Sequence, residues 1–420
     1  MRLGTKSLAL LAVAALATTA IQFGSVFPGL AHGLTSHHHM PVKPPPVQTP
    51  NIVNVKDYGA TGDGVTDDAP YIQNAINAAT ASGFALFFPA GTYLHAEPLT
   101  FNGIAVTGVG PTSILLAANT GAVVNLTGYG PSIQNMQIST QGLIGSGINI
   151  YVSNATSFTV SNNTITQGNK YFGVSVYFSS VGAINSNTFN GDGSPTDTGA
   201  QLNSVSNCSV NSNLFQNEAV AISAANYNQF IAVQNNVIGN ITYPTQSLGV
   251  QVLYGCNAVT ISGNTIQMAN SNDNSSYPIF LQYPSNVDII QNQTWGGWNA
   301  ILVELPQLPG GYFIEQNTIH NCGSSGIWID ASRSTNLVPT LLNNNVFGEC
   351  GLFDTSLTSA VISVFLSPTA PLVTSSQIMN NSYQGHANNL QFYVEAPKFS
   401  PSNISGNMQS QTALPGNPNN

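Results

Sequence analysis

Two acidic residues in the second half of the chain have the spacing of a catalytic pair. Glu304 and Asp330 lie 26 residues apart, and each ends a segment in which apolar residues alternate with others, NAILVE and SGIWID. Alternation of this kind is typical of β-strands. Glycoside cleavage needs two carboxyl groups, one that protonates the leaving oxygen and one that acts as nucleophile or base. We therefore expect Glu304 and Asp330 to perform this chemistry.

The residues around this pair favour contact with sugars. All three tryptophans of the chain fall in this region: Trp295, Trp298 and Trp328. Flat aromatic rings suit stacking on the C–H faces of a sugar. Three residues on neighbouring segments complete the expected substrate-binding set: Gln251, Gln282 and Tyr283. His320 and Arg333 flank Asp330 and are expected as accessory residues.

Other interpretations of the same residues stay open. A polysaccharide lyase would abstract a proton next to a uronate carboxylate, and it needs a base and a cation. Arg333 is the nearest candidate base, and Lys170 is a weaker one. The two carboxylates could instead form a calcium site, although no metal or cofactor is required by the hydrolase interpretation. A glycan-binding or surface protein without catalysis is the third possibility.

A repeat places the two carboxylates on successive turns of the chain. Phrases such as VSNNTI, ISGNTI and IEQNTI recur ten times, at intervals of 23 to 28 residues apart from one of 36. Short β-type segments at such a period predict stacked coils, here a right-handed parallel β-helix of about ten or more coils. The asparagine common to the phrases is expected to form a structural ladder: Asn163, Asn187, Asn213, Asn236, Asn264, Asn292, Asn317, Asn345, Asn381 and Asn407.

The strand after each phrase has the form G-[IV]-x-[IV]-x, with its third and fifth positions outward. The fifth positions form a column of Tyr151, Tyr177, Asn203, Ser223, Leu253, Gln282, Glu304 and Asp330. The third positions beside it include Asn149, Ser175, Gln201, Gln251 and Trp328. Strands about 4.8 Å apart bring the two carboxylates close enough to favour a nucleophile and retention of configuration. Side-chain rotamers can still open the pair to the inverting range.

The same register aligns Cys322 with Cys350 in consecutive turns. A disulfide between them and a stack of two unbridged buried thiols are both compatible with this alignment, and the chain has no CxxC pair to suggest zinc. The longer turns at 190–198 and 268–277 contain Asp192, Asp197 and Asp273, which we expect to be solvated.

The segment NVKDYGATGDGVTDDAPYIQNAINAATASGFALFFPAGTYL, residues 54–94, resembles the start of the pectate-lyase-like superfamily domain. Rhamnogalacturonase-like and epimerase-like right-handed β-helices share this domain. The resemblance implies carbohydrate chemistry over about residues 51–407. It does not identify a subfamily, because the N-T-D, adjacent D-D, G-H-G and R-x-K signatures of polygalacturonases and the D-P-H-D of alginate epimerases are missing. The aspartates of the segment are expected in turns and at a helix start.

A short helix over 67–82 is expected to cap the first coil, with Thr66 as its N-cap and Asp67 and Asp68 in its first turn. Solenoids need such caps at their ends.

The ends of the chain predict export. Arg2 and Lys6 precede an apolar run, so residues 1–31 are expected to be a signal peptide and 32–50 a Pro-rich linker. The β-helix domain would occupy 51–407 and a polar tail 408–420. We expect an extracellular or periplasmic protein without a membrane anchor once the signal is cleaved, as a monomer or a homotrimer.

Charge narrows the class of partner. The chain has 7 basic and 16 acidic residues, and loss of Arg2 and Lys6 would leave a net charge of −11. Nucleic-acid binding needs a basic surface, so it is excluded as a function class. A polysaccharide, neutral or weakly charged, is the expected partner.

Overall fold

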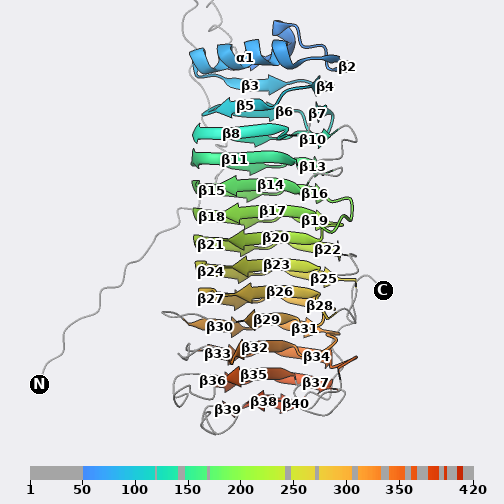
Figure 1. The fold of residues 1–420 in the computed structure, drawn as a ribbon, viewed down its shortest axis with the longest axis vertical. Coiled ribbons are helices and arrows are strands. Elements are labelled where there is room, and N and C mark those ends of the chain that lie inside the picture. The colour runs from blue at the N-terminus through green and yellow to red at the C-terminus, as the bar shows by residue number, and fades with distance from the viewer. Residues whose placement is uncertain are drawn as a thin grey trace, which may run out of the picture. The chain divides into compact units, whose positions relative to one another are not determined.

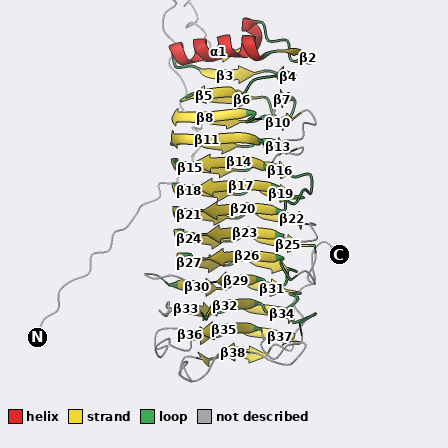
Figure 2. Cartoon of the chain, in the orientation of Figure 1, coloured by secondary structure: helices red, strands yellow, loops and turns green. Residues whose placement is uncertain are grey.

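A computed structural model of the chain describes residues 51–118, 121–140, 147–167, 171–241, 247–269, 274–304, 311–332, 340–354, 361–366, 377–386, 392–394 and 404–409. These residues form a parallel β-helix, in which each coil lies on the preceding one (Figure 1), so the predicted fold class is confirmed. Strands dominate the described residues, which include a single α-helix (Figure 2). No described helix has the length and hydropathy needed to cross a membrane.

Each coil contributes strands to three stacks. Stacks 1 and 2 belong to one 26-stranded sheet, and stack 3 is a 14-stranded sheet. Stack 1 contains β5 (Leu99–Asn102), β8 (Val124–Tyr129), β11 (Ile148–Thr156), β14 (Phe172–Tyr177), β17 (Thr198–Asn203), β20 (Val220–Ala225), β23 (Leu248–Leu253), β26 (Tyr277–Gln282), β29 (Ile301–Glu304), β32 (Ile327–Ala331), β35 (Ile362–Leu366) and β38 (Phe392–Val394).

Stack 2 follows stack 1 in each coil. It contains β1 (Ile52–Asn54), β3 (Ala85–Phe88), β6 (Ala105–Gly108), β9 (Ser132–Gln134), β12 (Thr159–Ser161), β15 (Ser180–Asn185), β18 (Ser206–Asn211), β21 (Gln229–Gln234), β24 (Asn257–Ser262), β27 (Ser285–Ile290), β30 (Tyr312–Glu315), β33 (Thr340–Asn343), β36 (Gln377–Met379) and β39 (Ile404–Ser405).

Stack 3 completes the coil. It contains β2 (Asp63–Asp67), β4 (Gly91–His95), β7 (Ser113–Ala117), β10 (Gln137–Thr140), β13 (Thr164–Thr166), β16 (Thr188–Asn190), β19 (Leu214–Gln216), β22 (Val237–Ile241), β25 (Thr265–Met268), β28 (Gln293–Trp295), β31 (Thr318–His320), β34 (Val346–Cys350), β37 (Ser382–His386) and β40 (Met408–Gln409).

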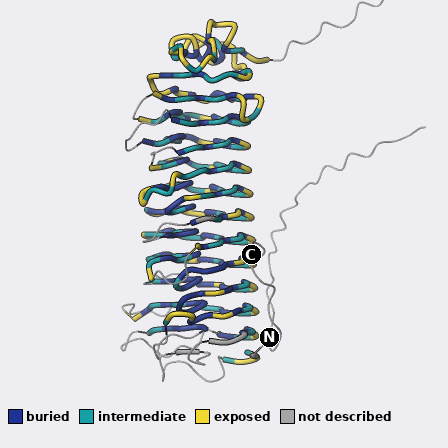
Figure 3. Tube along the Cα trace, turned by 90° about the vertical axis from the view of Figure 1, so that its right-hand side faces the viewer, coloured by how far each residue is buried: buried dark blue, intermediate teal, exposed yellow. Residues whose placement is uncertain are grey.

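The core is a column of aliphatic and aromatic side chains enclosed by the three stacks. Alternate strand residues point inward, so buried and less buried positions alternate along each coil (Figure 3). Identical side chains stack between coils; the rings of Phe189 and Phe215, for example, lie 4.4 Å apart and nearly parallel. In β14, Val174 and Val176 are fully buried, as the strand pattern predicts.

The predicted asparagine ladder is confirmed at the turn between stacks 2 and 3. The side-chain amide of Asn264 donates to Oδ1 of Asn292 at 2.9 Å and to the Val233 carbonyl at 2.9 Å. Its own Oδ1 accepts from the backbone N–H of Asn236 at 2.9 Å. Each rung thus satisfies turn groups that water cannot reach. The same bonds continue from Asn163 to Asn407.

The N-terminal end of the stack carries helix α1 (Ala69–Ser82). The expected N-cap at Thr66 is wrong: Asp68 occupies that position, and its carboxylate accepts from the backbone N–H groups of Thr61 and Gly62 at 2.7 and 3.0 Å instead of from the first turn of the helix. Asp63 accepts two backbone N–H bonds in the preceding turn, which lower its pKa to about 2. The expectation that Asp67 and Asp68 lie in the first helical turn is wrong, because the helix begins at Ala69, whereas the expected structural role of Asp63 and Asp68 in turns is confirmed.

Candidate functional site

The predicted register of the carboxylate pair is confirmed on stack 1. Residue Gln282 of β26 pairs with Glu304 of β29, which pairs with Asp330 of β32. Phe365 of β35 extends the column by one more strand. All are partly exposed, whereas Val303 before Glu304, and Ile329 and Ala331 on either side of Asp330, are buried. The two carboxylates therefore lie side by side on the outer face of stack 1.

Hydrogen bonds hold one oxygen of each carboxylate. The side-chain amide of Gln282 donates to Oε2 of Glu304 at 2.9 Å. The backbone N–H of Ser332 donates to Oδ1 of Asp330 at 3.0 Å. Bonds from described residues thus orient both groups and leave a second oxygen on each for a reaction partner. Hydrogen bonds to a charged acceptor are stronger than those between neutral groups.

The surface beside the pair is apolar. Trp328 occupies the outward position two residues before Asp330, and its ring stacks on Phe365 with centroids 4.5 Å apart. Leu302 pairs with Phe280 on one side and Trp328 on the other. An outward strip of this composition is a suitable floor for the C–H faces of a sugar ring. The prediction for Trp328 as a contact residue is compatible with its position.

A second row of aromatic residues follows the ends of the stack 1 strands. Tyr254 and Tyr283 stack with ring centroids 6.1 Å apart, and the backbone N–H of Tyr283 donates to the Glu304 carbonyl. Tyr227 and Phe178 continue the row and are 74% and 65% exposed. All four have φ values between 47° and 62°, in the left-handed region that bulky residues rarely adopt. Other stack 1 strands turn through the left-handed region too, for example at Asn154 and Ser204, so the conformation belongs to the coil turn and the ring is what these coils add.

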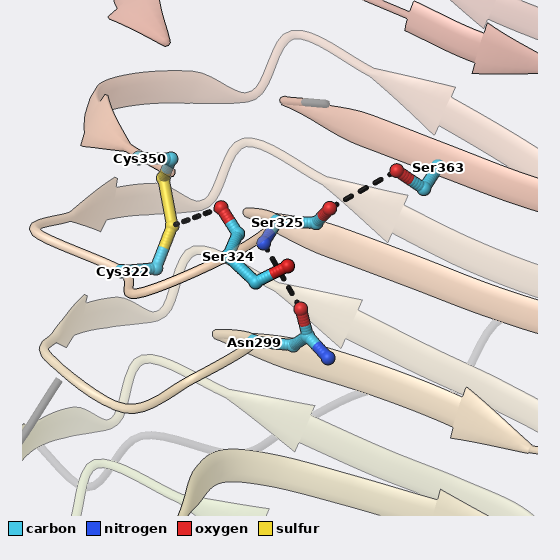
Figure 4. Close-up of a disulfide and its surroundings, with 6 residues drawn as sticks. All are labelled: Asn299, Cys322, Ser324, Ser325, Cys350 and Ser363. Atoms are coloured by element: carbon cyan, nitrogen blue, oxygen red, sulfur yellow. Dashed lines mark hydrogen bonds between the residues drawn. A yellow bond between two sulfur atoms is a disulfide. The ribbon is translucent and has the colours of Figure 1, made fainter. Parts of the chain in front are cut away.

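The turns between stack 3 and stack 1 that lead into β29, β32 and β35 are cross-linked to one another (Figure 4). Cys322 and Cys350 form a disulfide between consecutive turns, with their Cα atoms 4.5 Å apart. Beside it, Asn299 accepts from the backbone N–H of Ser325 at 2.9 Å, and the hydroxyls of Ser325 and Ser363 lie 3.0 Å apart. This bond and these contacts set the start of the strands whose ends carry Glu304 and Asp330.

Two predicted site residues lie elsewhere. Trp295 of β28 and His320 of β31 belong to stack 3, where their rings stack in parallel with centroids 5.3 Å apart. Both are only 7% exposed, and burial lowers the pKa of His320. The expectations of Trp295 as a sugar platform and of His320 as an accessory group are wrong, because the turn packs their rings together instead of presenting them to solvent.

Parts of the predicted outward columns are also wrong. Tyr151 pairs with Ser175, and Ser223 pairs with Gln201, so both belong to the third-position column. Asn149 is fully buried, and its amide donates to the Thr166 carbonyl. Both segments lie two residues out of the predicted alignment, so Tyr151 and Ser223 keep their outward face but occupy the third position instead of the fifth.

The remaining predicted residues are placed as follows. Gln251 lies on the outer face of β23, where its Oε1 accepts from Ser223 at 3.2 Å, and Trp298 is half-buried in the turn before β29. Arg333, Lys170 and Asp273 lie outside the described residues. Asp197 is buried, so its expected solvation is wrong.

The sequence interpretation missed several residues of this face. Phe280 and Leu302 occupy third positions of the predicted strands, so the same alignment contains them. Phe365 was missed because its segment lies within the long 36-residue interval of the repeat, although VISVFL has the strand pattern. The exposed row of Phe178 and Tyr227 follows immediately after the aligned segments.

No group of three or more His, Cys, Asp or Glu side chains is arranged to hold a metal ion within the part of the chain that the structure describes.

Comparison with known proteins agrees with this architecture. The family model described as rhamnogalacturonase A/epimerase, pectate lyase-like matches residues 52–246. Mannuronan C5-epimerase AlgE1 of Azotobacter vinelandii is 34% identical over 110 residues, which are 23% of this chain and 8% of that protein. The pre-neck appendage protein of Bacillus phage phi29 is 32% identical over 123 residues, 29% of this chain and 12% of that protein. The chain thus spans a small part of these relatives.

Among solved structures, the Dettilon tailspike protein has a TM-score of 0.50 at 12% identity, and the match covers 86% of this chain and 68% of that one. This likeness concerns the fold alone. The family match, by contrast, identifies residues 52–246 as belonging to the pectate-lyase-like superfamily, and the stacked coils agree with it.

Proposed function

We propose that the protein is a glycoside hydrolase that cleaves a polysaccharide lying across the outer face of stack 1. The observation that carries the proposal is the register of Glu304 and Asp330, two outward carboxylates on adjacent strands beside an aromatic surface. Parallel strands are about 4.8 Å apart, which favours a retaining mechanism with a carboxylate nucleophile.

The two carboxyl groups would divide the reaction between them. One, protonated, gives its proton to the glycosidic oxygen as the bond to the anomeric carbon breaks. The other, ionised, attacks the anomeric carbon, and a water molecule then releases the sugar while the first group takes the proton from that water. Each carboxylate receives one hydrogen bond, from Gln282 or from Ser332, so the bonds do not assign the two roles.

The substrate is proposed to be neutral or weakly charged. The described, partly exposed residues next to the pair have aromatic or amide side chains: Gln251, Phe280, Gln282, Trp328 and Phe365. A polyuronate would have to approach two carboxylates in a protein of net charge −9. Stacking on Trp328 and on the row of Tyr254 and Tyr283 would supply affinity without charge.

Export is part of the same proposal. An enzyme that cleaves extracellular polysaccharides has to be exported. The basic and apolar segments of residues 1–31 fit a signal peptide.

The test compares reducing ends released from a panel of neutral glycans by wild type, Glu304→Gln and Asp330→Asn. We expect each variant to lose about 10²–10⁴-fold of the rate, the usual contribution of acid–base groups. Glu315→Gln is the matched control, because Glu315 is a partly exposed carboxylate on stack 2 of the coil that also contains Glu304. Full activity in both site variants would refute the pair.

A further inference from the structure

Three successive turns between stacks 3 and 1 bring oxygen-bearing side chains into the protein interior. Gln167 follows β13, Asp197 precedes β17, and Glu218 lies between β19 and β20. Their side chains are 0%, 1% and 1% exposed. Burial of two carboxyl groups is rare unless each is paired, because the charged forms lose their hydration.

Four oxygen atoms of this group have no hydrogen-bond partner within the described part of the protein. They are both oxygens of the Glu218 carboxylate, Oδ1 of Asp197 and Oε1 of Gln167. The donors that face this group have other acceptors: the Gln167 amide N–H donates to the Thr198 carbonyl, and the N–H groups of Asp192 and Ser194 donate to the other oxygen of Asp197. The Gln167 amide also lies near enough to Glu218 to lower the pKa of that carboxyl in part. Unpaired buried oxygens are uncommon in native proteins and require an explanation.

Contacts between the turns bring the Glu218 carboxyl close to the turn that contains Asp192 and Asp197. The residue before Asp192 is Gly191, and a Cβ there would lie 3.1 Å from the carboxyl carbon of Glu218. Coil stacking is direct, since the N–H of Val220 donates to the Asp197 carbonyl at 2.9 Å. Burial, and then the negative charge of Asp197, raise the pKa of Glu218, while burial and Asp192 raise the pKa of Asp197 to about 7.

We propose that Gln167, Asp197 and Glu218 bind one calcium ion. Calcium takes six to eight oxygen ligands at flexible geometry, and carboxylate and amide oxygens are the ligands it prefers. Two carboxylates balance the charge of a divalent ion. The oxygens found here receive no hydrogen bond, so their lone pairs are available to a cation. The third ligand is an amide, so this site is not one of the groups of three His, Cys, Asp or Glu side chains considered above.

The ion would clamp the turns of three coils together, next to the starts of β17 and β20. Glu304 lies on β29, three strands further along stack 1 from β20, so calcium at this place would contribute to stability and not to bond cleavage. Failure of this proposal would therefore leave the proposed hydrolase untouched, and the reverse also holds.

The experiment measures bound metal and melting temperature on the full chain after dialysis against a chelator. We expect one calcium ion per chain on re-addition and a rise in Tm of about a few degrees at a hundredfold excess over Kd. Glu218→Gln should abolish both effects and should still fold, because it replaces a buried carboxylate by a neutral group of the same shape. Gln167→Leu keeps both carboxylates and should weaken binding about tenfold or more.

Two further variants separate the explanations. Asp288→Asn alters a partly buried carboxylate on stack 2 and should leave calcium binding unchanged. Lys170, the nearest basic residue in sequence, lies outside the described residues, and Lys170→Met should also leave binding unchanged. Absence of bound calcium in wild type, with a Tm that calcium does not alter, would overturn the proposal. Stabilisation by Glu218→Gln would then indicate protonated carboxyl groups, and loss of stability in Lys170→Met would indicate a lysine counter-charge.

Discussion

At the scale of single residues, Gln282 is the described side chain that acts most directly on the proposed catalytic pair. Its amide holds one oxygen of Glu304 at 2.9 Å. In Gln282→Leu this charge-assisted bond is lost while the volume is nearly kept, and such bonds contribute about 1.5–3 kcal/mol. We expect kcat to fall about tenfold or more. Gln251→Leu, on β23, is the control and should change the rate much less; equal effects would mean that both residues only bind substrate.

His320 gives a prediction for stability. Burial against Trp295 lowers its pKa, so the folded protein binds this proton less readily than the unfolded chain does. The contribution of neutral His320 is therefore complete above the ordinary pKa of 6.5 and is lost as the pH falls below it. Urea unfolding at pH 7 and pH 5 should show a smaller loss of stability in His320→Phe than in wild type. If wild type and His320→Phe lost the same stability between pH 7 and pH 5, His320 would not be buried in its neutral form.

The sequence predicted the register of Glu304 and Asp330 correctly, because their segments are 26 residues apart with matching patterns and no insertion disturbs the alignment. It failed for Tyr151, because matching the glycines of SGINIY and FGVSVY puts the two segments two residues out of the observed register, in which Tyr151 pairs with Ser175. Trp295 and His320 failed for another reason. Whether a turn packs its rings inward depends on neighbouring coils, and the residues of a single turn do not contain that information.

At the scale of elements, we expect substitutions in the asparagine ladder, in the turn between stacks 2 and 3, to lower the stability of the fold strongly. Asn264→Ala removes two side-chain donor bonds and leaves the N–H of Asn236 without its acceptor. We expect a loss of about 2–4 kcal/mol in the free energy of unfolding by urea. Asn74→Ala, on the exposed side of α1, is the control and should change stability little. Equal losses would contradict the structural role of the ladder.

The disulfide is an element-scale feature that sequence left undecided. Register brings Cys322 and Cys350 together, but two thiols could pack in the same place. Titration of the unfolded, unreduced protein should find two free thiols per chain, those of Cys208 and Cys256, and four after reduction. Closing this 28-residue separation stabilises by about 3–4 kcal/mol in the chain-entropy model, so reduction should also lower Tm. Four thiols before reduction would contradict the bond.

At the scale of the whole molecule, the repeat determined the fold. Its period and the buried asparagine required coils to stack, and that stacking then put distant residues such as Tyr254 and Asp330 on one outer face. Substrate specificity does not follow from the repeat, because it depends on turns whose lengths vary from coil to coil. The segments before residue 51, on which the expectation of export rests, stay predictions.

The central claim is hydrolysis of a polysaccharide, and the most direct measurement identifies the bond-breaking chemistry. Wild-type protein is incubated with neutral glycans and with polyuronates, and new reducing ends are read in parallel with the ultraviolet absorbance of unsaturated uronates. We predict new reducing ends from a neutral glycan without new unsaturation. Unsaturated products would contradict the account and indicate a lyase, and the absence of cleavage on every glycan would indicate a binding surface without catalysis.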